Sequence, residues 1–137
     1  MNELSRILLK FITLILGIED MQNFPPPLSK EEESLMFERM RDGDLKARDV
    51  IIERNLRLVS HIIKKYYASY AGVDDLLSIG SLGLIKAVDS FKSEYGTRFA
   101  TYGAKCIQNA ILSQRTFLEH TMQKKFHSTK SGTYFNA

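Results

Sequence analysis

Residues 74–91 of the chain read DDLLSIGSLGLIKAVDSF and carry the clearest structural signal in the sequence. Their apolar spacing is typical of a helix and shows no strand-type alternation. Asp74 or Asp75 is expected to cap the start, since adjacent carboxylates at a helix start are usually caps. Gly80 and Gly83 stand three residues apart, a spacing that lets another helix approach closely. The Gly-Lys-Ser/Thr ending of a phosphate-binding loop is missing, so we expect no such loop here.

Helix signals continue on the N-terminal side of this stretch. Ser29 stands three residues before Glu32, a capping-box arrangement that predicts a helix from there to about Arg41. The turn Asp42-Gly43-Asp44 ends that helix and caps the next one. Seven apolar residues then recur at three-, four- and seven-residue steps and predict one long helix. They are Leu45, Ile52, Leu56, Val59, Ile63, Tyr66 and Tyr70.

Two further helices follow along the chain. A break at Ala71-Gly72 precedes the third helix, which is expected to run to about Ser90, and residues 91–96 form a turn. The fourth helix begins near Thr97. Its apolar positions are Phe99, Tyr102, Cys106, Ile107 and Ile111. Four helices joined by short loops predict an all-α fold, a compact helical bundle.

The composition limits the possible functions. The 137 residues carry a formal net charge of +3, which suits nucleic acid, an anionic membrane or an acidic partner surface. Cys106 is the single cysteine, so we expect neither an internal disulfide nor a thiolate metal site. His61, His120 and His127 are scattered, and no nucleophile–base pair is visible. We therefore predict a protein that is not an enzyme and that uses no metal and no cofactor.

Aromatic and basic residues interleave over residues 91–115. They are Phe91, Lys92, Tyr95, Arg98, Phe99, Tyr102, Lys105 and Arg115. Flat rings that stack on bases, next to cations that attract phosphates, are typical of proteins that bind single strands. The alternative is that Phe99 and Tyr102, three residues apart, are core residues of the last helix, and the exposure of the two rings distinguishes these interpretations.

Three blocks of the sequence resemble the second conserved region of the sigma-70 family of RNA polymerase sigma factors. They are residues 55–59 (NLRLV), residues 74–91 (quoted above) and residues 96–111 (GTRFATYGAKCIQNAI). Their order and spacing are similar to the family pattern almost without gaps over about residues 28–112. The resemblance implies a bundle of the sigma region 2 type that binds core RNA polymerase and promoter DNA, mainly the single-stranded −10 element.

The resemblance also implies roles for individual side chains. One set corresponds to the surface that docks on the clamp helices of the largest polymerase subunit: Asp75, Leu76, Gly80, Gly83, Leu84 and Lys86. A second set corresponds to the element that opens the strands and holds an unstacked adenine against aromatic rings: Lys92, Tyr95, Arg98, Phe99, Thr101 and Tyr102. A third set corresponds to the helical face that meets the upstream part of the −10 element: Lys105, Gln108, Asn109 and Leu112.

The chain departs from the family pattern at several places. Housekeeping members carry two adjacent tryptophans where this chain has Lys105 and Cys106, a pair that resembles the sporulation-type members and implies a different promoter sequence. Tyr95 occupies a place that is often basic. We find no resemblance to the third and fourth conserved regions in these residues, so we expect the helix-turn-helix that reads the −35 element to be missing from them.

Both ends of the chain are expected to differ from the bundle, which we assign to residues 23–115. Residues 1–22 are apolar and resemble the pro-sequence of sporulation-type members, which holds a precursor at the membrane until an intramembrane protease removes it. A core helix and a secretory signal peptide are the alternatives. Residues 116–137 lose the apolar periodicity and are expected to form a divergent, disordered tail.

These features predict the N-terminal part of a sigma factor that acts in sporulation, in the cytoplasm and at the membrane surface before processing. One alternative is a module that binds the polymerase clamp without initiating transcription. Another is the inactive product of an interrupted gene. A membrane-anchored helical protein unrelated to transcription is a third possibility, and it predicts no binding to core polymerase.

Overall fold

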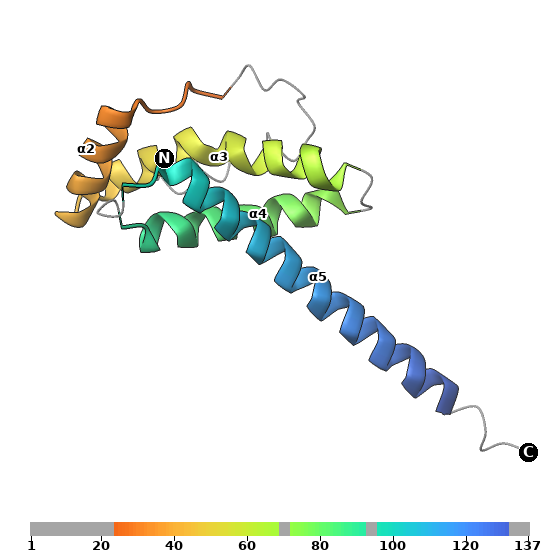
Figure 1. Cartoon of the computed structure of the whole chain (residues 1–137). Coiled ribbons are helices and arrows are strands. Elements are labelled where there is room, and N and C mark those ends of the chain that lie inside the picture. The colour runs from red at the N-terminus through yellow and green to blue at the C-terminus, as the bar shows by residue number, and fades with distance from the viewer. Residues whose placement is uncertain (1–23, 69–71, 93–95, 132–137) are drawn as a thin grey trace, which may run out of the picture.

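The computed structural model describes residues 24–68, 72–92 and 96–131, so Tyr95 and the predicted leader over residues 1–22 lie outside the described residues. Within those ranges every regular element is a helix, which confirms the all-α prediction. The helices are α2 (Lys30–Arg41), α3 (Leu45–Tyr67), α4 (Val73–Ser90) and α5 (Phe99–Ser131). In Figure 1, α3 and α4 run side by side in opposite directions, α2 lies across one end, and α5 crosses the pair and extends beyond it.

The starts of α2 and α3 follow the predicted capping signals. The Ser29 hydroxyl accepts a hydrogen bond from the Glu32 N–H at 3.2 Å, and the Glu32 carboxylate accepts one from the Ser29 N–H at 2.8 Å. At the start of α3, the Asp44 carboxylate accepts hydrogen bonds from the N–H groups of Lys46 and Ala47. The bond from Ala47 is the main reason why the pKa of Asp44 lies below its ordinary value. Both caps are therefore confirmed.

Helix α4 starts differently from the prediction. Gly72 is its N-cap, with a φ of 106° in the left-handed region that glycine tolerates, and no side chain caps the helix. Asp74 and Asp75 lie in the first turn and are exposed. The prediction that one of them is the cap is wrong, because the chain already enters the helix at Val73. Their carboxylates still stabilise this end through the helix dipole.

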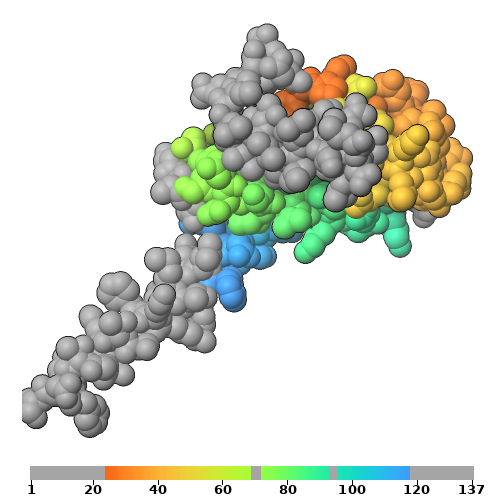
Figure 2. All heavy atoms as spheres, turned by 180° about the vertical axis from the view of Figure 1, so that it is seen from behind, coloured from red at the N-terminus to blue at the C-terminus, as the bar shows by residue number. Residues whose placement is uncertain are grey.

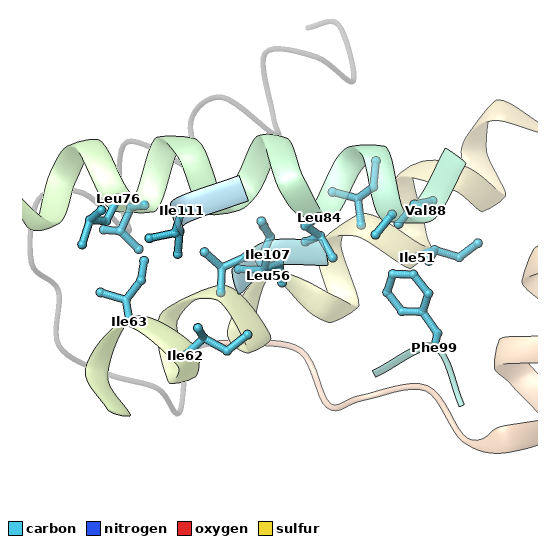
Figure 3. Packing of buried hydrophobic residues seen from close by; sticks show 14 of the residues in the cluster. Ile51, Leu56, Ile62, Ile63, Leu76, Leu84, Val88, Phe99, Ile107 and Ile111 are labelled. Atoms are coloured by element: carbon cyan, nitrogen blue, oxygen red, sulfur yellow. The ribbon is translucent and has the colours of Figure 1, made fainter. Parts of the chain in front are cut away.

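The core lies between α3, α4 and α5 (Figure 3). Helix α2 contributes the ring of Phe37 to it. The buried members of the core are Phe37, Ile51, Ile52, Leu56, Val59, Ile62, Ile63, Leu76, Leu77, Leu84, Ala87, Val88, Phe99, Ile107 and Ile111. The predicted apolar stripe of α3 is buried in its middle. The predicted stripe does not extend to the two ends of α3, because Leu45 is 72 % exposed and Tyr66 is also exposed. Tyr70, its last predicted member, lies outside the described residues.

Gly80 and Gly83 set the distance between α4 and its neighbours. A Cβ atom at Gly80 would lie 2.8 Å from Val59 Cγ1 of α3, and one at Gly83 would lie 2.9 Å from Ala110 Cβ of α5. The second would also lie 3.2 Å from the Cα of Ile107, a backbone atom that cannot turn aside. The prediction of close helix approach is confirmed, and the helices that approach are α3 and α5 of the same chain.

Helix α5 is longer than the sequence predicts. It runs to Ser131, so the prediction of disorder for residues 116–137 does not hold over 116–131. Residues 116–131 contain no glycine or proline, and a helix that is already nucleated in the bundle extends at little cost. In Figure 2 the blue part of α5 leaves the body formed by the other helices. Among the described helices, none combines the length and the apolar character of a membrane span.

Candidate nucleic-acid and polymerase interfaces

Four aromatic rings pack together where α2, α4 and α5 meet, and Phe91 lies among them. Its ring centroid is 4.8 Å from that of Phe37, 5.3 Å from that of Phe99 and 5.5 Å from that of Tyr102. Phe99 is 0 % exposed, and Figure 3 shows its ring inside the core. A base cannot stack on a fully covered ring, so the predicted DNA contact of Phe99 is wrong and the core alternative holds. Tyr102 is only half-buried, so part of its surface reaches solvent.

Glu33 of α2 holds the start of α5. Its carboxylate accepts a hydrogen bond from the Phe99 N–H at 3.0 Å and lies 3.4 Å from Nε of Arg98. Glu33 is only 9 % exposed, and a buried carboxylate is stable where such partners satisfy it. Sequence reasoning gave Glu33 no role. A signal was present, because Glu33 precedes the buried Phe37 by four residues and therefore lies on the same helical face.

The outward face of α5 carries most of the other predicted DNA contacts. Its exposed members are Thr101, Lys105, Asn109 and Leu112. They follow one another at steps of three or four residues, so they share one side of the helix. Gln108 is half-buried at the edge of this face. The structure thus brings the third predicted set together on one surface, and the amides of Gln108 and Asn109 are groups that can pair with base edges.

Three cations lie close to Tyr102 along the chain. Arg98 and Lys105 come one helical turn before and after it, and Lys92 follows the Phe91 ring on which Tyr102 packs. All three cations are exposed. Arg98 also pairs with Glu33, and its guanidinium lies 3.5 Å from the Leu28 carbonyl oxygen, so part of its charge is used within the protein.

The polymerase-docking prediction for α4 is only partly compatible with the structure. Asp75 and Lys86 are exposed, as a docking surface requires. The other four predicted residues are buried in the bundle: Leu76, Gly80, Gly83 and Leu84. Their assignment to the polymerase contact is wrong, because they pack against the other helices of the chain.

Sequence reasoning missed Leu82 on the outward face of α4. Leu82 is 60 % exposed and lies seven residues after Asp75 and four before Lys86, so the three share one side of the helix. An exposed leucine between an acidic and a basic residue forms a small apolar patch with a charged rim. We call Asp75, Leu82 and Lys86 the α4 outer stripe. The helical spacing from the predicted residues Asp75 and Lys86 could have located Leu82 from the sequence.

Comparison with known proteins identifies the bundle. Residues 51–118 match the family described as sigma-70 region 2. A protein of Bacillus thuringiensis subsp. kurstaki named as an RNA polymerase sigma-G factor is 35 % identical over 86 residues, which cover 63 % of this chain and 69 % of that protein. The chain belongs to the sigma-70 family. The matched residues include all of α4 and the bundle-packed part of α5, so both candidate surfaces lie on sigma region 2.

Two longer sigma factors are also similar to this chain. The RNA polymerase sigma-28 factor of Bacillus thuringiensis subsp. kurstaki is 48 % identical over 98 residues, 72 % of this chain and 41 % of the relative. The RNA polymerase sigma-K factor of Bacillus subtilis is 49 % identical over 89 residues, 65 % of this chain and 30 % of the relative. The chain therefore spans less than half the length of these two sigma factors.

The described part of this sigma-family chain shows no metal centre. Among residues 24–68, 72–92 and 96–131, no three His, Cys, Asp or Glu side chains come together in a way that could hold a metal ion. Cys106 is half-buried and packs against the core, while its neighbour Lys105 points outward into solvent. The two residues that replace the tryptophan pair therefore differ in accessibility, and only Lys105 lies on the exposed face.

Proposed function

We propose that this chain is the part of an RNA polymerase sigma factor that binds core polymerase and holds the melted −10 promoter element open. In this role it is a non-catalytic specificity subunit that acts in transcription initiation. The observation that carries the proposal is the half-buried Tyr102 ring on a sigma region 2 fold, with the exposed cations Lys92, Arg98 and Lys105 close to it along the chain.

The energetics assign separate tasks to the ring and the cations. Taking a base out of the stack costs a few kcal/mol, whereas stacking on one aromatic ring returns roughly 1–3 kcal/mol. Phe99 and Tyr102 are the two predicted aromatic contacts on α5, and since Phe99 is in the core, Tyr102 is the one of this pair that can stack. Attraction of phosphates to the three cations offsets the rest of the free energy needed to unstack the base. Binding should therefore weaken steeply as salt rises.

The α4 outer stripe is the surface that we propose for the polymerase. An apolar centre with charges on either side is typical of protein interfaces, whose cores are apolar and whose rims are polar. Leu82 forms the centre, and Asp75 and Lys86 lie on either side of it. The partner surface is the clamp helices of the largest polymerase subunit, as the family resemblance implies.

The remaining parts of the proposal depend on the relatives and on the sequence. The similarity to a protein named as a sigma-K factor supports a role in sporulation. We propose that the chain acts in the cytoplasm, where its polymerase partner would be. We propose that Lys105, Gln108, Asn109 and Leu112 meet the upstream part of the −10 element. The membrane association and proteolytic removal of residues 1–22 stay predictions, because that segment lies outside the described residues.

Binding to a single strand tests the proposal. The chain bound to core polymerase first enriches a non-template strand from a random pool. That strand is then labelled with a fluorophore and titrated with the complex. Tyr102→Ala is compared with the wild type in the same titration. Loss of the ring should weaken binding about five- to 150-fold, which corresponds to the stacking energy of one base. Tyr66→Ala is the matched control, because Tyr66 is an exposed tyrosine on α3, and it should bind like the wild type.

The alternative function, a clamp-binding module without promoter activity, makes a different prediction in the same assay. Such a module would bind core polymerase through the α4 outer stripe, enrich no strand, and be indifferent to Tyr102→Ala. A chain that binds neither core polymerase nor DNA would contradict both functions.

A further inference from the structure

Ser90, the last residue of α4, lies within hydrogen-bond distance of three oxygen atoms. Its Oγ is 2.7 Å from the Lys86 carbonyl oxygen, 3.0 Å from the Tyr102 hydroxyl and 3.5 Å from the Ala87 carbonyl oxygen. A serine hydroxyl has one proton to donate, and a carbonyl oxygen can only accept. The proton of Ser90 therefore goes to Lys86, at the shortest distance. The Tyr102 hydroxyl then donates its own proton to Ser90.

This hydrogen bond holds one end of the Tyr102 side chain, and Phe91 holds the ring. The planes of the two rings are tilted by 43°, with 5.5 Å between their centroids. Phe91 in turn packs edge-on against the fully buried Phe99. A tyrosine side chain turns about only two bonds, and these two contacts restrict both. The half-exposed ring is therefore held in one orientation before any ligand binds.

We propose that Ser90 is a positioning residue for base stacking, which holds Tyr102 in the orientation that receives the unstacked base. This inference rests on the proposed function, in which Tyr102 supplies the stacking surface. Ser90 acts through the Tyr102 hydroxyl and has no need to touch the DNA itself. A ring that is already held loses less conformational freedom on binding, so more of the stacking energy appears as affinity.

The competing interpretation is that the Ser90 hydroxyl only satisfies its own helix. Serine side chains often bond to the carbonyl oxygen four residues earlier, as Ser90 does with Lys86. On that interpretation the contact with Tyr102 is incidental, and removing the hydroxyl would leave DNA binding unchanged.

A cycle of three variants distinguishes the two interpretations. Ser90→Ala, Tyr102→Phe and the double variant are prepared in the full chain and bound to core polymerase. The probe is the strand that the wild type enriches from the random pool, and its dissociation constant is measured by fluorescence anisotropy. Each single variant should bind about three- to tenfold more weakly, the effect of one hydrogen bond. The double variant should bind no more weakly than the single ones, since both changes remove the same bond.

Two further variants serve as controls. Ser90→Thr keeps the hydroxyl and should restore the affinity of the wild type. Thr116→Ala removes a hydroxyl that donates to the carbonyl oxygen four residues earlier, at 3.0 Å, just as Ser90 does, and it should leave the affinity unchanged. Thermal unfolding of every variant establishes that the fold is intact.

The outcomes separate this inference from the proposed function. If Ser90→Ala binds like the wild type while Tyr102→Ala binds weakly, the positioning role of Ser90 is overturned and the proposed function stands. Additive losses in the double variant overturn it too, because Ser90 would then act without the Tyr102 hydroxyl. A wild-type chain that enriches no strand overturns the proposed function, and the role of Ser90 with it.

Discussion

Helices α4 and α5 pack on each other, yet the resemblance to sigma factors assigns their side chains with different success. On α5 the implied residues Thr101, Lys105 and Asn109 are exposed on one face, and Phe99 is the exception. On α4 most of the implied docking residues are buried, and the exposed Leu82 is not among them. A resemblance therefore locates the segment that functions, whereas the helical period decides which of its faces can meet a partner.

The reason for the difference is what each helix supplies to the core. Helix α4 lies between α3 and α5, so it has to present small or apolar residues to both. A match at Gly80, Gly83 or Leu84 then reports the fold of the family and says little about its partners. Helix α5 buries a narrower stripe and leaves more of its surface to solvent, so more of its matching residues are available for contacts.

The largest expected effect is on the free energy of unfolding and comes from Phe99, the implied DNA contact on α5 that is buried. Phe99→Ala should lower the free energy of unfolding by about 3–5 kcal/mol, because it removes a fully buried ring from the aromatic cluster. Urea unfolding followed by circular dichroism measures this loss. Leu45→Ala is the control and should change it by no more than about 0.5 kcal/mol, since Leu45 is exposed. A Phe99→Ala chain with wild-type stability and no DNA binding would restore Phe99 as a DNA contact.

The second largest expected loss of stability comes from a substitution on the buried face of α4. Gly83→Ala gains about 1 kcal/mol of helix propensity, but the added methyl meets Ala110 and the backbone of Ile107, and overpacking costs about 1–3 kcal/mol. Because backbone cannot turn aside, we expect the overpacking cost to lie in the upper half of that range, which leaves a net loss of about 1–2 kcal/mol in the same urea assay. Ser78→Ala, on the exposed side of α4, should leave the stability unchanged. A stable Gly83→Ala chain with weakened polymerase binding would instead place the glycine in the interface.

The sequence predicts the helices of this chain better than it predicts the orientation of their side chains. Capping signals such as Ser29 with Glu32 are local, so they are readable without the fold, and the structure confirms them. The cap on α5 is supplied by Glu33, whose partner Phe99 lies 66 residues along the chain. No local pattern reveals such a pair. The Ser90–Tyr102 contact is of the same kind, since it depends on how α4 and α5 cross.

A substitution in the α4 outer stripe should weaken polymerase binding and leave the stability of the chain unchanged. Leu82→Asp should weaken the affinity for core polymerase about fivefold, roughly 1 kcal/mol, because it puts a charge at the apolar centre of the patch. The stability should stay within about 0.5 kcal/mol of the wild type, since Leu82 is exposed. Pull-down titrations with core polymerase measure the affinity. The matched control is Leu35→Asp, an exposed leucine of α2, and an equal loss in that variant would show that the effect is general.

The smallest expected effect on stability comes from an ion pair at the C-terminal end of α4. Asp89 Oδ1 of α4 lies 2.7 Å from Nε of Arg48 in α3. The hydrogen bond from Arg48 lowers the pKa of Asp89 below its ordinary value. A carboxyl whose pKa is lowered in the folded state stabilises the fold above its unfolded pKa, near 4, and this contribution is lost as the pH falls through the folded value. Asp89→Asn should therefore reduce the stability at pH 6 and converge with the wild type in acid.

The size of this effect follows from exposure. About half of the Asp89 side chain reaches solvent, so the pair should be worth less than about 1 kcal/mol, and salt should reduce it further. Urea unfolding at pH 6 and pH 3 measures it, with Arg48→Met as the background in which Asp89→Asn should have no further effect. A loss as large as that of Gly83→Ala would mean that the solvent-facing side of α4 also holds the bundle together, and the division of α4 into a packing face and a binding face would then fail.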